Sequence, residues 1–540
     1  MASQAVEVEK KYDVGQDAEV PFLAEIPGVA RVGEPRVDTL EAVYFDTAGH
    51  TLASRDITLR RRTGGVDAGW HLKLTAEGPR YGDGSGSEPR RRLELHAPLG
   101  QPGVVPDSLL AHVLGYLRGE NAAPVVRLET RRTTYPLYGE DGLHLADLAD
   151  DRVSAELLGA ADGAAGGAAA LAPDGEAASD PDPDTRMRQW REWELELVHG
   201  SPDLFPAAAV ILAAAGARPA KHGSKLARVL ALPARDTGTA AGPDSPGKKG
   251  PVSDLLTAYL AAQIREILAH DPGVRLEEPE AVHDLRSATR RARSALTAYR
   301  RLYSGVAVRR LGDELKWLGS VLGKPRDAEV MLARLLLHAN ELPPGLAAAV
   351  KGRLENELGN RLNTAYRKLQ KALLSERYFR LLDDLEAFRD HPPMRPEGAA
   401  PARKASAKLV SKAAKRLQRA ARSAKRARRG AEHEAALHEV RKDAKRLRHV
   451  AESAGPVHGK RTAKIAKAAH LQQQVLGDFH DSVVARDLLA KLAAAPDLPA
   501  AVAAAYVTLH TRQVQLAADA EAGYRKKRKK SRSLLRGGVR

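Results

Sequence analysis

The chain has 540 residues, with 85 Lys and Arg against 68 Asp and Glu, and it contains no cysteine. The lack of cysteine excludes disulfides, thiolate metal sites and cysteine nucleophiles, so any chemistry must use carboxylates, histidines and cations. Hydrophobic residues make up 43% of the chain, enough for at least two cores, and no apolar run approaches the roughly 18 residues that span a bilayer. We expect two or more soluble domains in a reducing cytoplasm.

The charge is divided unevenly along the chain. Residues 1–250 hold 28 basic and 37 acidic side chains, a net charge of −9, whereas residues 251–540 hold 57 and 31, a net charge of +26. A strongly positive half indicates a polyanionic partner, such as nucleic acid, a phosphate polymer or an anionic membrane surface. The first half, with cations scattered among its acids, indicates a site of mixed sign.

Composition also predicts the domain organisation. Residues 160–184 consist mainly of Ala, Gly, Pro and Asp without periodicity, which is typical of a flexible insertion, and residues 234–252 are rich in Gly, Pro and Ser, which is typical of a linker. We therefore predict a first domain over residues 1–233, a linker over 234–252, a helical domain over 253–525 and a basic tail over 526–540.

Charged and apolar residues alternate with period two in the first domain, which predicts antiparallel strands. The alternating segments are residues 6–9, 58–62, 70–74, 92–95, 126–129 and 192–197. Short helices are expected at about 106–118, 205–216 and 224–232, which makes the domain α+β and dominated by a sheet. After the linker, apolar residues recur every three or four positions, so residues 253–525 are predicted to be all helical.

Carboxylates dominate one face of the first and last strands, and cations dominate the strands between them. The set comprises Glu7, Glu9 and Lys11; Arg60 and Arg62; His71 and Lys73; Arg92 and Glu94; Arg127, Glu129 and Arg131; and Glu192, Glu194 and Glu196. For any single strand, the simpler interpretation is a sheet with one face in water. The order of the whole set favours a closed sheet, with acids facing one another, cations on the remaining wall and apolar side chains outside under helices. Carboxylate oxygens suit Mg²⁺ or Mn²⁺, and Arg and Lys suit a chain of phosphates.

The pattern Glu7-x-Glu9-x-Lys11 resembles the ExExK signature of the CYTH superfamily, the triphosphate tunnel metalloenzymes. Further motifs follow in the order of that family over residues 5–232, namely Tyr44-Phe45-Asp46-Thr47, Leu59-Arg60-Arg61-Arg62, Trp70-x-x-Lys73, Glu192-x-Glu194-x-Glu196 and Ser224-Lys225. The resemblance implies an eight-stranded antiparallel tunnel that binds a triphosphate together with a divalent metal ion.

The same resemblance implies roles for individual residues. It implies a catalytic role for Glu7, Glu9 and Lys11. It implies metal-binding or water-positioning roles for Glu7, Glu9, Asp147, Glu194 and Glu196. It implies triphosphate binding by Lys11, Arg60, Arg62, Lys73, Arg92, Arg127 and Lys225. The neighbouring acids Asp150 and Asp151 leave the choice of Asp147 open. Members of the family act on inorganic tripolyphosphate, thiamine triphosphate or ATP, and none of these residues selects among the three substrates.

An internal repeat organises the basic half. Residues 282–293 align with residues 437–448, and the matched pairs are His283 with His438, Arg286 with Arg441, Arg290 with Lys445, and Arg293 with Arg448. A Leu-Gly…Asp motif follows each copy, at residues 322–327 and 476–481. A single stripe of this kind is usually structural or solvated. Its duplication favours two helical bundles, related by a pseudo-twofold axis, whose cationic faces could line a common groove.

A third stripe lies at residues 403–429, where twelve cations and no acid predict one long amphipathic helix. With the duplicated H-x-x-R-x-x-x-[RK]-R-x-R pattern, residues 253–525 resemble the CHAD domain, the conserved histidine α-helical domain. The resemblance implies binding of inorganic polyphosphate, with His283, Arg286, Arg290, Arg293, His438, Arg441, Lys445 and Arg448 as candidate ligands. Arg326 stands where the second copy has His480, so this pair is given no common role.

These features favour a cytoplasmic enzyme, a metal-dependent inorganic triphosphatase that hydrolyses tripolyphosphate or short-chain polyphosphate while its helical domain captures polyphosphate. It could associate with polyphosphate granules, and no membrane partner is expected. One alternative is a non-catalytic polyphosphate-binding protein, and another is a nucleic-acid-binding protein, which the scarcity of aromatic residues makes the weakest. The tail at 526–540 could be a disordered solubilising end, a nucleic-acid contact or a further phosphate anchor, and its run of like charges favours the first.

Overall fold

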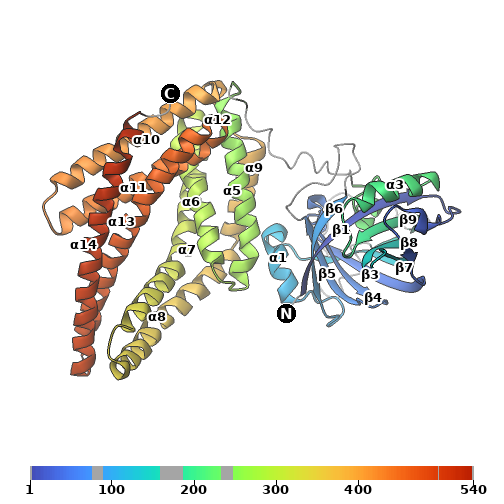
Figure 1. The fold of residues 1–540 in the computed structure, drawn as a ribbon, viewed down its shortest axis with the longest axis horizontal. Coiled ribbons are helices and arrows are strands. Elements are labelled where there is room, and N and C mark those ends of the chain that lie inside the picture. Colours follow the sequence, from blue (N-terminus) through green and yellow to red (C-terminus); the bar gives the residue numbers. More distant parts are fainter. Residues whose placement is uncertain are drawn as a thin grey trace, which may run out of the picture. The chain divides into compact units, whose positions relative to one another are not determined.

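The computed structural model describes residues 3–75, 89–158, 187–232, 247, 249–496 and 498–537. The chain divides into two units, Met1–Thr237 and Gly238–Arg540 (Figure 1). The expected insertion at 160–184 and most of the expected linker at 234–252 lie outside the described residues. Among the helices of the described ranges, none combines the length and the hydropathy needed to cross a membrane.

Eight long antiparallel strands close into a barrel in the first unit. They are β1 (Ser3–Val14), β3 (Arg36–Asp46), β4 (Thr58–Thr63), β5 (Gly69–Thr75), β6 (Arg90–Ala97), β7 (Ala123–Tyr138), β8 (His144–Leu157) and β9 (Met187–Leu197). The neighbours run β1-β6-β5-β4-β3-β7-β8-β9, and β9 pairs back with β1. Two short strands, β2 (Arg31–Val32) and β10 (Arg218–Pro219), pair with β7 and β1. The predicted α+β fold with an eight-stranded antiparallel barrel is confirmed.

Apolar side chains cover much of the outside of this barrel, as the period-two pattern predicts. Tyr12, Trp193 and Leu195 lie outside β1 and β9 and pack against α3 (Leu204–Ala214). On another side, Trp70 and neighbouring apolar residues pack against α1 (Asp107–Leu117). The charged residues that alternate with these apolar residues along the strands therefore face the interior of the barrel.

A short helix, α4 (Lys225–Val229), closes one end of the barrel from inside. Ser224 caps it, because its hydroxyl accepts a hydrogen bond from the backbone N–H of Ala227. Leu226 and Val229 are fully buried in a cluster formed by the inward-facing residues Ala42, Tyr44, Val126, Leu128, Val153, Ala155 and Trp190. The interior is therefore apolar and filled at the α4 end, and Lys225 is left at the border with the polar remainder.

The second unit is helical and consists of two similar bundles, as predicted. The first contains α5 (Val252–Arg275), α6 (Ala281–Tyr299), α7 (Gly305–Ala339), α8 (Pro344–Leu373) and α9 (Glu376–Asp390). The second contains α10 (Ala402–Arg426), α11 (Ala431–Ser453), α12 (Gly455–His458), α13 (Lys460–Ala493) and α14 (Ala500–Gly537). Helices α6 and α11, which carry the two sequence repeats, contact each other across the bundles. Single 3-10 turns lie at Leu23–Glu25, Ala53–Arg55, Arg300–Leu302 and Pro396–Ala399.

The basic tail is helical rather than disordered as far as the structure describes it, so that prediction was wrong. Helix α14 continues to Gly537 because one side of its last turns is buried on the second bundle. Tyr524 and Leu535 belong to that core, and the side-chain amide of Gln472 donates a hydrogen bond to the Ser531 hydroxyl at 2.8 Å. Only one side of the tail is charged, and a run of like charges does not reveal the apolar positions within it.

Candidate functional site

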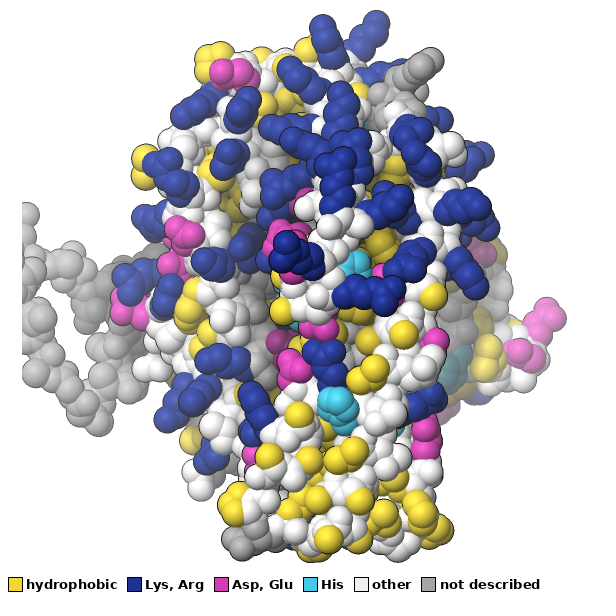
Figure 2. Space-filling model, turned by 90° about the vertical axis from the view of Figure 1, so that its left-hand side faces the viewer, with side chains coloured by type: hydrophobic (Ala, Val, Ile, Leu, Met, Phe, Trp, Pro, Cys, Tyr) yellow, Lys and Arg dark blue, Asp and Glu magenta, His cyan; other side chains and the backbone are white. Residues whose placement is uncertain are grey.

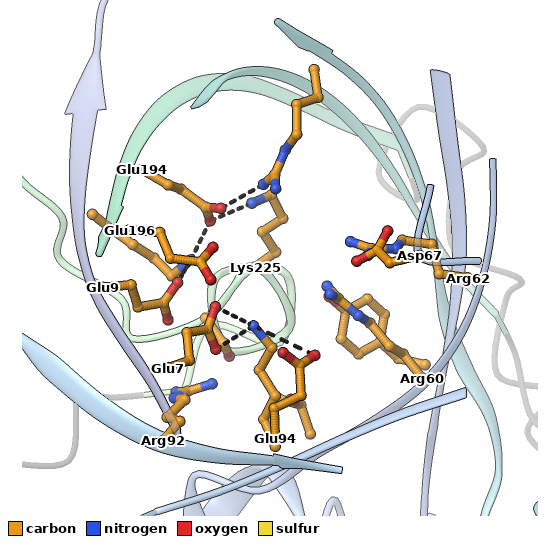
Figure 3. A pocket seen from close by; sticks show the side chains of 16 residues that line it. Glu7, Glu9, Arg60, Arg62, Asp67, Arg92, Glu94, Glu194, Glu196 and Lys225 are labelled. Atoms are coloured by element: carbon orange, nitrogen blue, oxygen red, sulfur yellow. Dashed lines mark hydrogen bonds and ion pairs between the residues drawn. The ribbon is translucent and has the colours of Figure 1, made fainter. Parts of the chain in front are cut away.

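A polar pocket occupies the interior of the barrel on the open side of α4 (Figure 3). Its lining contains six carboxylates (Glu7, Glu9, Asp67, Glu94, Glu194 and Glu196), seven cations (Lys11, Arg60, Arg62, Lys73, Arg92, Arg132 and Lys225) and the neutral residues Tyr44, Thr58 and Ser224. Strands β1 and β9 supply four of the carboxylates, which lie on one side of the pocket, and β4 supplies Arg60 and Arg62 on the other. The pocket therefore has an acidic wall and a basic wall.

On the acidic wall, two of three neighbouring carboxylates, Glu7 and Glu196, have too little positive charge near them. Burial, followed by the negative charge of Glu7, raises the pKa of Glu196 to about 8. Burial and the charge of Glu9 likewise raise the pKa of Glu7, although Lys73 donates to both of its oxygens at 2.6 Å. A divalent cation beside these oxygens would offset the repulsion, and carboxylate oxygens suit Mg²⁺ or Mn²⁺, so Glu7, Glu9 and Glu196 are candidate metal ligands.

Glu9 differs from its neighbours because lysines lie close to it. Burial alone would raise its pKa, but Lys11 and Lys73 outweigh that effect and hold the pKa at about 2. The Lys11 ammonium lies 2.8 Å from Glu9 and also binds Glu194. Glu9 is therefore ionised at neutral pH and can bind a cation without first losing a proton.

Among the described residues, the carboxylates whose oxygens already lie close enough together to hold a metal ion are those of a second acidic group, Asp151, Glu192 and Glu194. Its centre, however, is taken by the ammonium of Lys225, which lies 2.8 Å from Asp151, 2.8 Å from Glu192 and 2.6 Å from Glu194. All four residues are buried. We therefore interpret this group as the anchor that holds Lys225 in place and not as the metal site.

The basic wall lacks enough negative charge. Burial and the charges of Arg60 and Arg132 lower the pKa of Arg62 to about 9, even though Asp67 forms an ion pair with it. Arg60 donates a hydrogen bond to the Tyr44 hydroxyl at 3.2 Å. Buried guanidinium groups that repel one another are stabilised by an anion that can bind several of them together, which is what a phosphate chain provides.

His71 is a neutral residue that contacts two residues of the pocket lining. One ring nitrogen lies 2.9 Å from Glu94 and the other 2.9 Å from the carbonyl oxygen of Asp67. Burial lowers its pKa to about 4 despite the neighbouring Glu94. A neutral ring has one N–H, so His71 donates to only one of these two acceptors at a time and adds no charge to the pocket.

Ten residues that the sequence analysis assigned to this site line the pocket: Glu7, Glu9, Lys11, Arg60, Arg62, Lys73, Arg92, Glu194, Glu196 and Lys225. Two others do not. The side chain of Arg127 is 45% exposed and pairs with Glu41 and Glu156. Asp147 faces Glu196 across the β8–β9 pairing, but its side chain is one-third exposed and binds His144 at 2.8 Å.

The sequence analysis also missed a central residue, Arg132. It binds Asp151 through two hydrogen bonds of 2.6 and 2.7 Å and Glu194 at 2.5 Å. On β7 the even-numbered side chains face inward, including Val126 and Leu128, which pack under α4. Arg127 is odd-numbered and faces outward. Arg132 lies an even number of residues after Val126, so both face the same side of β7. The sequence analysis placed the apolar face of every strand outside the barrel and therefore put Arg132 on the wrong side.

The second unit brings the two sequence repeats together in one cationic cluster. Burial and the charges of Arg286, Arg448 and Arg441 lower the pKa of Arg290 to about 10. Burial and the charges of Arg290, Arg441 and Arg286 lower the pKa of Lys445 to about 7. Residues of both α6 and α11 thus contribute charge to one place, which we call the α6–α11 cluster.

The glycines of the two Leu-Gly…Asp motifs lie beside this cluster. The guanidinium of Arg286 lies 3.5 Å from the point that a Cβ of Gly323 would occupy, and that of Arg441 lies 3.6 Å from the corresponding point of Gly477. The two bundles therefore match at the level of side chains. Within the described residues, the buried Nε atoms of Arg290 and Arg441 have no hydrogen-bond partner. An anion entering the cluster would find unused donors.

Other predicted ligands of this unit occupy different surroundings. The ring of His438 lies 4.7 Å from that of His480, whereas His283 faces Arg326, which binds Glu280 and Glu329. Arg448 donates to Glu452 at 2.7 Å. Arg293 is exposed on α6. His449 of α11, which was not predicted as a ligand, is buried beside the cluster. Burial and the charges of Arg290 and Arg448 lower the pKa of His449 to about 2.

Comparisons with known proteins agree with this division. The CYTH domain model matches residues 5–219, and the CHAD domain model matches residues 258–490. The uncharacterized proteins Rv2226 and MT2285, from two strains of Mycobacterium tuberculosis, are 38% identical over 522 residues, which cover 95% of this chain and 93% of theirs.

Solved structures match each unit separately. The CHAD domain from the plant Ricinus communis is 27% identical, with a TM-score of 0.43, and the match covers 52% of this chain and 92% of that domain. HpAC1 from Hippeastrum, for which a dominant triphosphatase activity is described, is 15% identical, with a TM-score of 0.24, over 42% of this chain and 95% of its own.

Proposed function

Because this chain belongs to the family in which a CYTH domain is followed by a CHAD domain, we propose that it is a metal-dependent triphosphatase of inorganic tripolyphosphate or short-chain polyphosphate. CYTH domains are associated with metal-dependent enzymes that act on phosphoanhydride bonds. We further propose that the helical unit binds inorganic polyphosphate and that the protein works in the cytoplasm, at polyphosphate granules.

The observation that carries the hydrolytic proposal is the pair of opposed walls in the barrel (Figure 3). A phosphate chain needs cations along its length and a metal ion at the bond to be broken. Arg60 and Arg62 of the basic wall supply the first, together with Arg132, which lies beside Asp151 and Glu194. The acidic wall, with Glu7, Glu9 and Glu196, supplies oxygen donors for the second. A binding site for a small neutral molecule would need neither wall.

Several side chains have separable tasks in this proposal. Arg60, Arg62 and Arg132 bind and orient the phosphate chain and stabilise charge on the leaving phosphate. Glu7, Glu9 and Glu196 would hold Mg²⁺ or Mn²⁺, which when bound neutralises phosphate oxygens. We assign to Glu196 only the orientation of the attacking water, because a carboxyl with a pKa of about 8 is mostly protonated at neutral pH and cannot act as a base. The proton of that water passes to a phosphate oxygen of the substrate. As the oxygen of that water bonds to phosphorus, the phosphoanhydride bond breaks and the shortened chain leaves.

Inorganic substrates are favoured over nucleotides by the character of the pocket. Its lining is almost entirely charged, and Tyr44 is its sole aromatic residue within the described ranges. The Tyr44 hydroxyl accepts a hydrogen bond from Arg60, so the ring is already engaged. A nucleobase would therefore find little surface on which to stack.

The decisive experiment is phosphate release from tripolyphosphate, ATP and thiamine triphosphate, measured side by side with Mg²⁺, with Mn²⁺ and with excess EDTA. We expect tripolyphosphate to be the best substrate and EDTA to abolish release. Undiminished release in EDTA would contradict the metal site. No release from any of the three, with polyphosphate binding retained, would instead support a non-catalytic polyphosphate-binding protein.

For the helical unit, the proposal rests on the α6–α11 cluster, where two repeats place lysine and arginine side chains that lack enough counter-charge. Binding should weaken steeply with salt, as for other linear polyanions. Granule association is testable by imaging the tagged protein together with a polyphosphate stain, with diffuse fluorescence as the contradicting result.

A further inference from the structure

Helix α10 carries a long row of exposed cations on the side opposite its packed face. Val410, Leu417 and Ala421 belong to the core of the second bundle. Arg403, Lys404, Lys408, Lys412, Lys415, Arg416, Arg419, Arg422, Lys425 and Arg426 are exposed. Helix α10 contains no acidic residue. The α6–α11 cluster uses none of these side chains.

The end of α14 adds a second row of cations, and the two helices meet near Gln418 and Leu535. The side-chain amide of Gln418 on α10 donates a hydrogen bond to the carbonyl of Leu535 on α14 at 3.0 Å, and both helices pack into the same core. The exposed cations of this stretch are Arg525, Lys526, Lys527, Lys529, Lys530, Arg532 and Arg536, again without an acid between them. We call the two rows together the α10–α14 face, and Lys and Arg side chains dominate the upper part of the surface shown in Figure 2.

Very little negative charge balances this face. Within the described part of the chain, Arg416 pairs with Asp443 and Arg525 with Glu521, and these are the ion pairs that its exposed cations make. Like charges held a few ångströms apart repel one another and destabilise the bundle. A surface that retains so many of them is suited to an external polyanion.

We propose that the α10–α14 face binds the phosphate backbones of a nucleic-acid duplex without reading its sequence. The ten cations of α10 lie between Arg403 and Arg426, so they follow one another at about 3.8 Å of helix axis each. The phosphates of one duplex strand follow one another at about 3.4 Å of duplex axis. The linear densities of the two charge rows therefore match.

The spread of the cations favours a duplex over a single phosphate chain. Helices α10 and α14 meet near Gln418 and Leu535 and cross obliquely, so their exposed cations cover a surface and do not follow one line (Figure 1). A duplex presents phosphates over a comparable surface, whereas a single-file polymer would follow one line. It would also have to lose conformational freedom to lie along an exposed convex helix, whereas a duplex is already stiff.

Side chains absent from the face also narrow the choice of partner. In the described stretches 402–426 and 525–536, no large apolar side chain is exposed, so nothing is available to insert into a bilayer. Exposed aromatic residues, on which single-stranded bases would stack, are missing from the same stretches. The lack of aromatic residues disfavours single-stranded nucleic acid, but it does not disfavour a duplex whose backbones alone are bound.

The test uses the full-length protein and a fluorescent 30-base-pair DNA duplex of mixed sequence, titrated at several salt concentrations. The face variant replaces four exposed cations of α10, in Lys408→Gln, Lys412→Gln, Arg419→Gln and Arg422→Gln. The control variant makes the same change of charge on α8, in Arg353→Gln, Arg367→Gln, Lys368→Gln and Lys371→Gln. We expect the face variant to lose at least about tenfold in affinity and to lower the slope of log affinity against log salt by about two to four, and the control variant to lower that slope by less than one.

A third variant, Arg290→Glu in the α6–α11 cluster, separates this face from the proposed polyphosphate site. It should retain duplex binding, and the face variant should retain polyphosphate binding. Equal losses of duplex affinity in the face and control variants would overturn the proposal, as would duplex binding that depends on Arg290 instead.

Tighter binding of the face to anionic phospholipid vesicles than to the duplex, at equal salt, would replace the duplex by a membrane surface. Melting temperatures establish that each variant is folded, and phosphate release from tripolyphosphate reports separately on the barrel.

Discussion

The barrel pocket and the α6–α11 cluster are both rich in buried or half-buried cations, but they differ in what balances those cations. In the barrel, carboxylates from β1, β8 and β9 lie among the lysines and arginines, and Lys225 alone contacts three of them. In the cluster, Arg290 and Lys445 are surrounded mainly by other cations, and their pKa values are lowered as a result. Mixed charge creates two kinds of subsite within one pocket, whereas charge of a single sign creates only affinity for anions. The difference indicates where a phosphate chain would be cleaved and where it would only be held.

The largest effect should follow from removing one charge on the acidic wall. Glu9→Gln keeps the shape of the side chain but removes a carboxylate that is ionised at neutral pH. We expect at least about a hundredfold loss of turnover of tripolyphosphate, which is typical of removing an electrostatic catalytic group. The matched control is Glu129→Gln on the exposed side of β7, which should retain full activity. Full activity in Glu9→Gln would remove the distinction between the two regions.

A charge reversal in the cluster should produce the next largest effect, on binding alone. Arg290→Glu places an acid where both repeats contribute charge, so the affinity for long-chain polyphosphate should fall by at least about tenfold. Turnover of tripolyphosphate should not change. Arg293→Glu makes the same change at an exposed position of the same helix and should have a much smaller effect.

Stoichiometry in the same titrations tests whether the repeats act together. A shared groove predicts reduced affinity with an unchanged number of sites. Two independent sites predict halved stoichiometry and unchanged affinity in Arg290→Glu, and that result would contradict the single cluster.

A third prediction concerns pH. In the free protein Lys445 has a pKa of about 7, far below its ordinary value of 10.5, because of burial and because Arg286 and Arg290 on α6 and Arg441 on α11 repel its proton, with Asp327 on α7 opposing them. Bound polyanion would favour the charged form. Affinity should therefore fall by about three- to tenfold as the pH rises from 7 to 9, with proton uptake on binding.

Histidines of the cluster do not interfere with this measurement. Burial lowers the pKa values of His438, His449 and His480 below their ordinary value, so these rings remain neutral from pH 7 to 9. Lys445→Arg keeps the charge at every pH and should bind equally well at both ends of the range. Calorimetry in two buffers of different ionisation enthalpy measures the proton uptake, and a wild-type protein without uptake would contradict the assignment.

Lys445 also affects folding in the absence of polymer. Because its pKa is lower in the folded than in the unfolded chain, stability should decrease as the pH falls from 10.5 toward about 7, where the unfolded chain takes up a proton that the folded cluster resists. Thermal unfolding of Lys445→Gln should lack this component.

The smallest effect is expected at Arg127, where sequence and structure disagree. Its side chain lies outside the barrel between Glu41 and Glu156, so Arg127→Ala should change turnover by less than about twofold. Arg132→Ala, on the inward face of the same strand, should lower turnover strongly. A larger loss of turnover in Arg127→Ala than in Arg132→Ala would contradict the inward position of Arg132 on β7.

Much of the barrel could be predicted because β1 and β9 follow a simple rule. Their apolar residues, such as Tyr12, Trp193 and Leu195, pack outside against α3, so the charged residues that alternate with them, such as Lys11 and Glu194, face inward. Strand β7 breaks the rule, because α4 fills the interior with apolar side chains and therefore needs apolar partners such as Leu128 on the inner face. Alternation alone cannot say which face is inside when both faces contain charge.

In the helical unit, the limits of prediction have a different origin. The repeats identified α6 and α11 correctly, because a duplicated stripe needs no knowledge of packing. Helical spacing placed Arg293 on the stripe, but it did not reveal that the buried part of the contact lies at His449. Burial at a helix–helix contact depends on the crossing of the two helices, which a single helical pattern does not contain.

Helix α4 leaves the barrel open at one end only, because Leu226 and Val229 fill the other end with apolar contacts. If the barrel hydrolyses phosphate chains, a long polymer cannot be threaded through it, and the product must leave by the mouth through which the substrate entered. Cleavage would then start at a free chain terminus and proceed stepwise, with release between steps. Cyclic trimetaphosphate has no terminus and should resist the enzyme, whereas linear tripolyphosphate of the same phosphorus content should not.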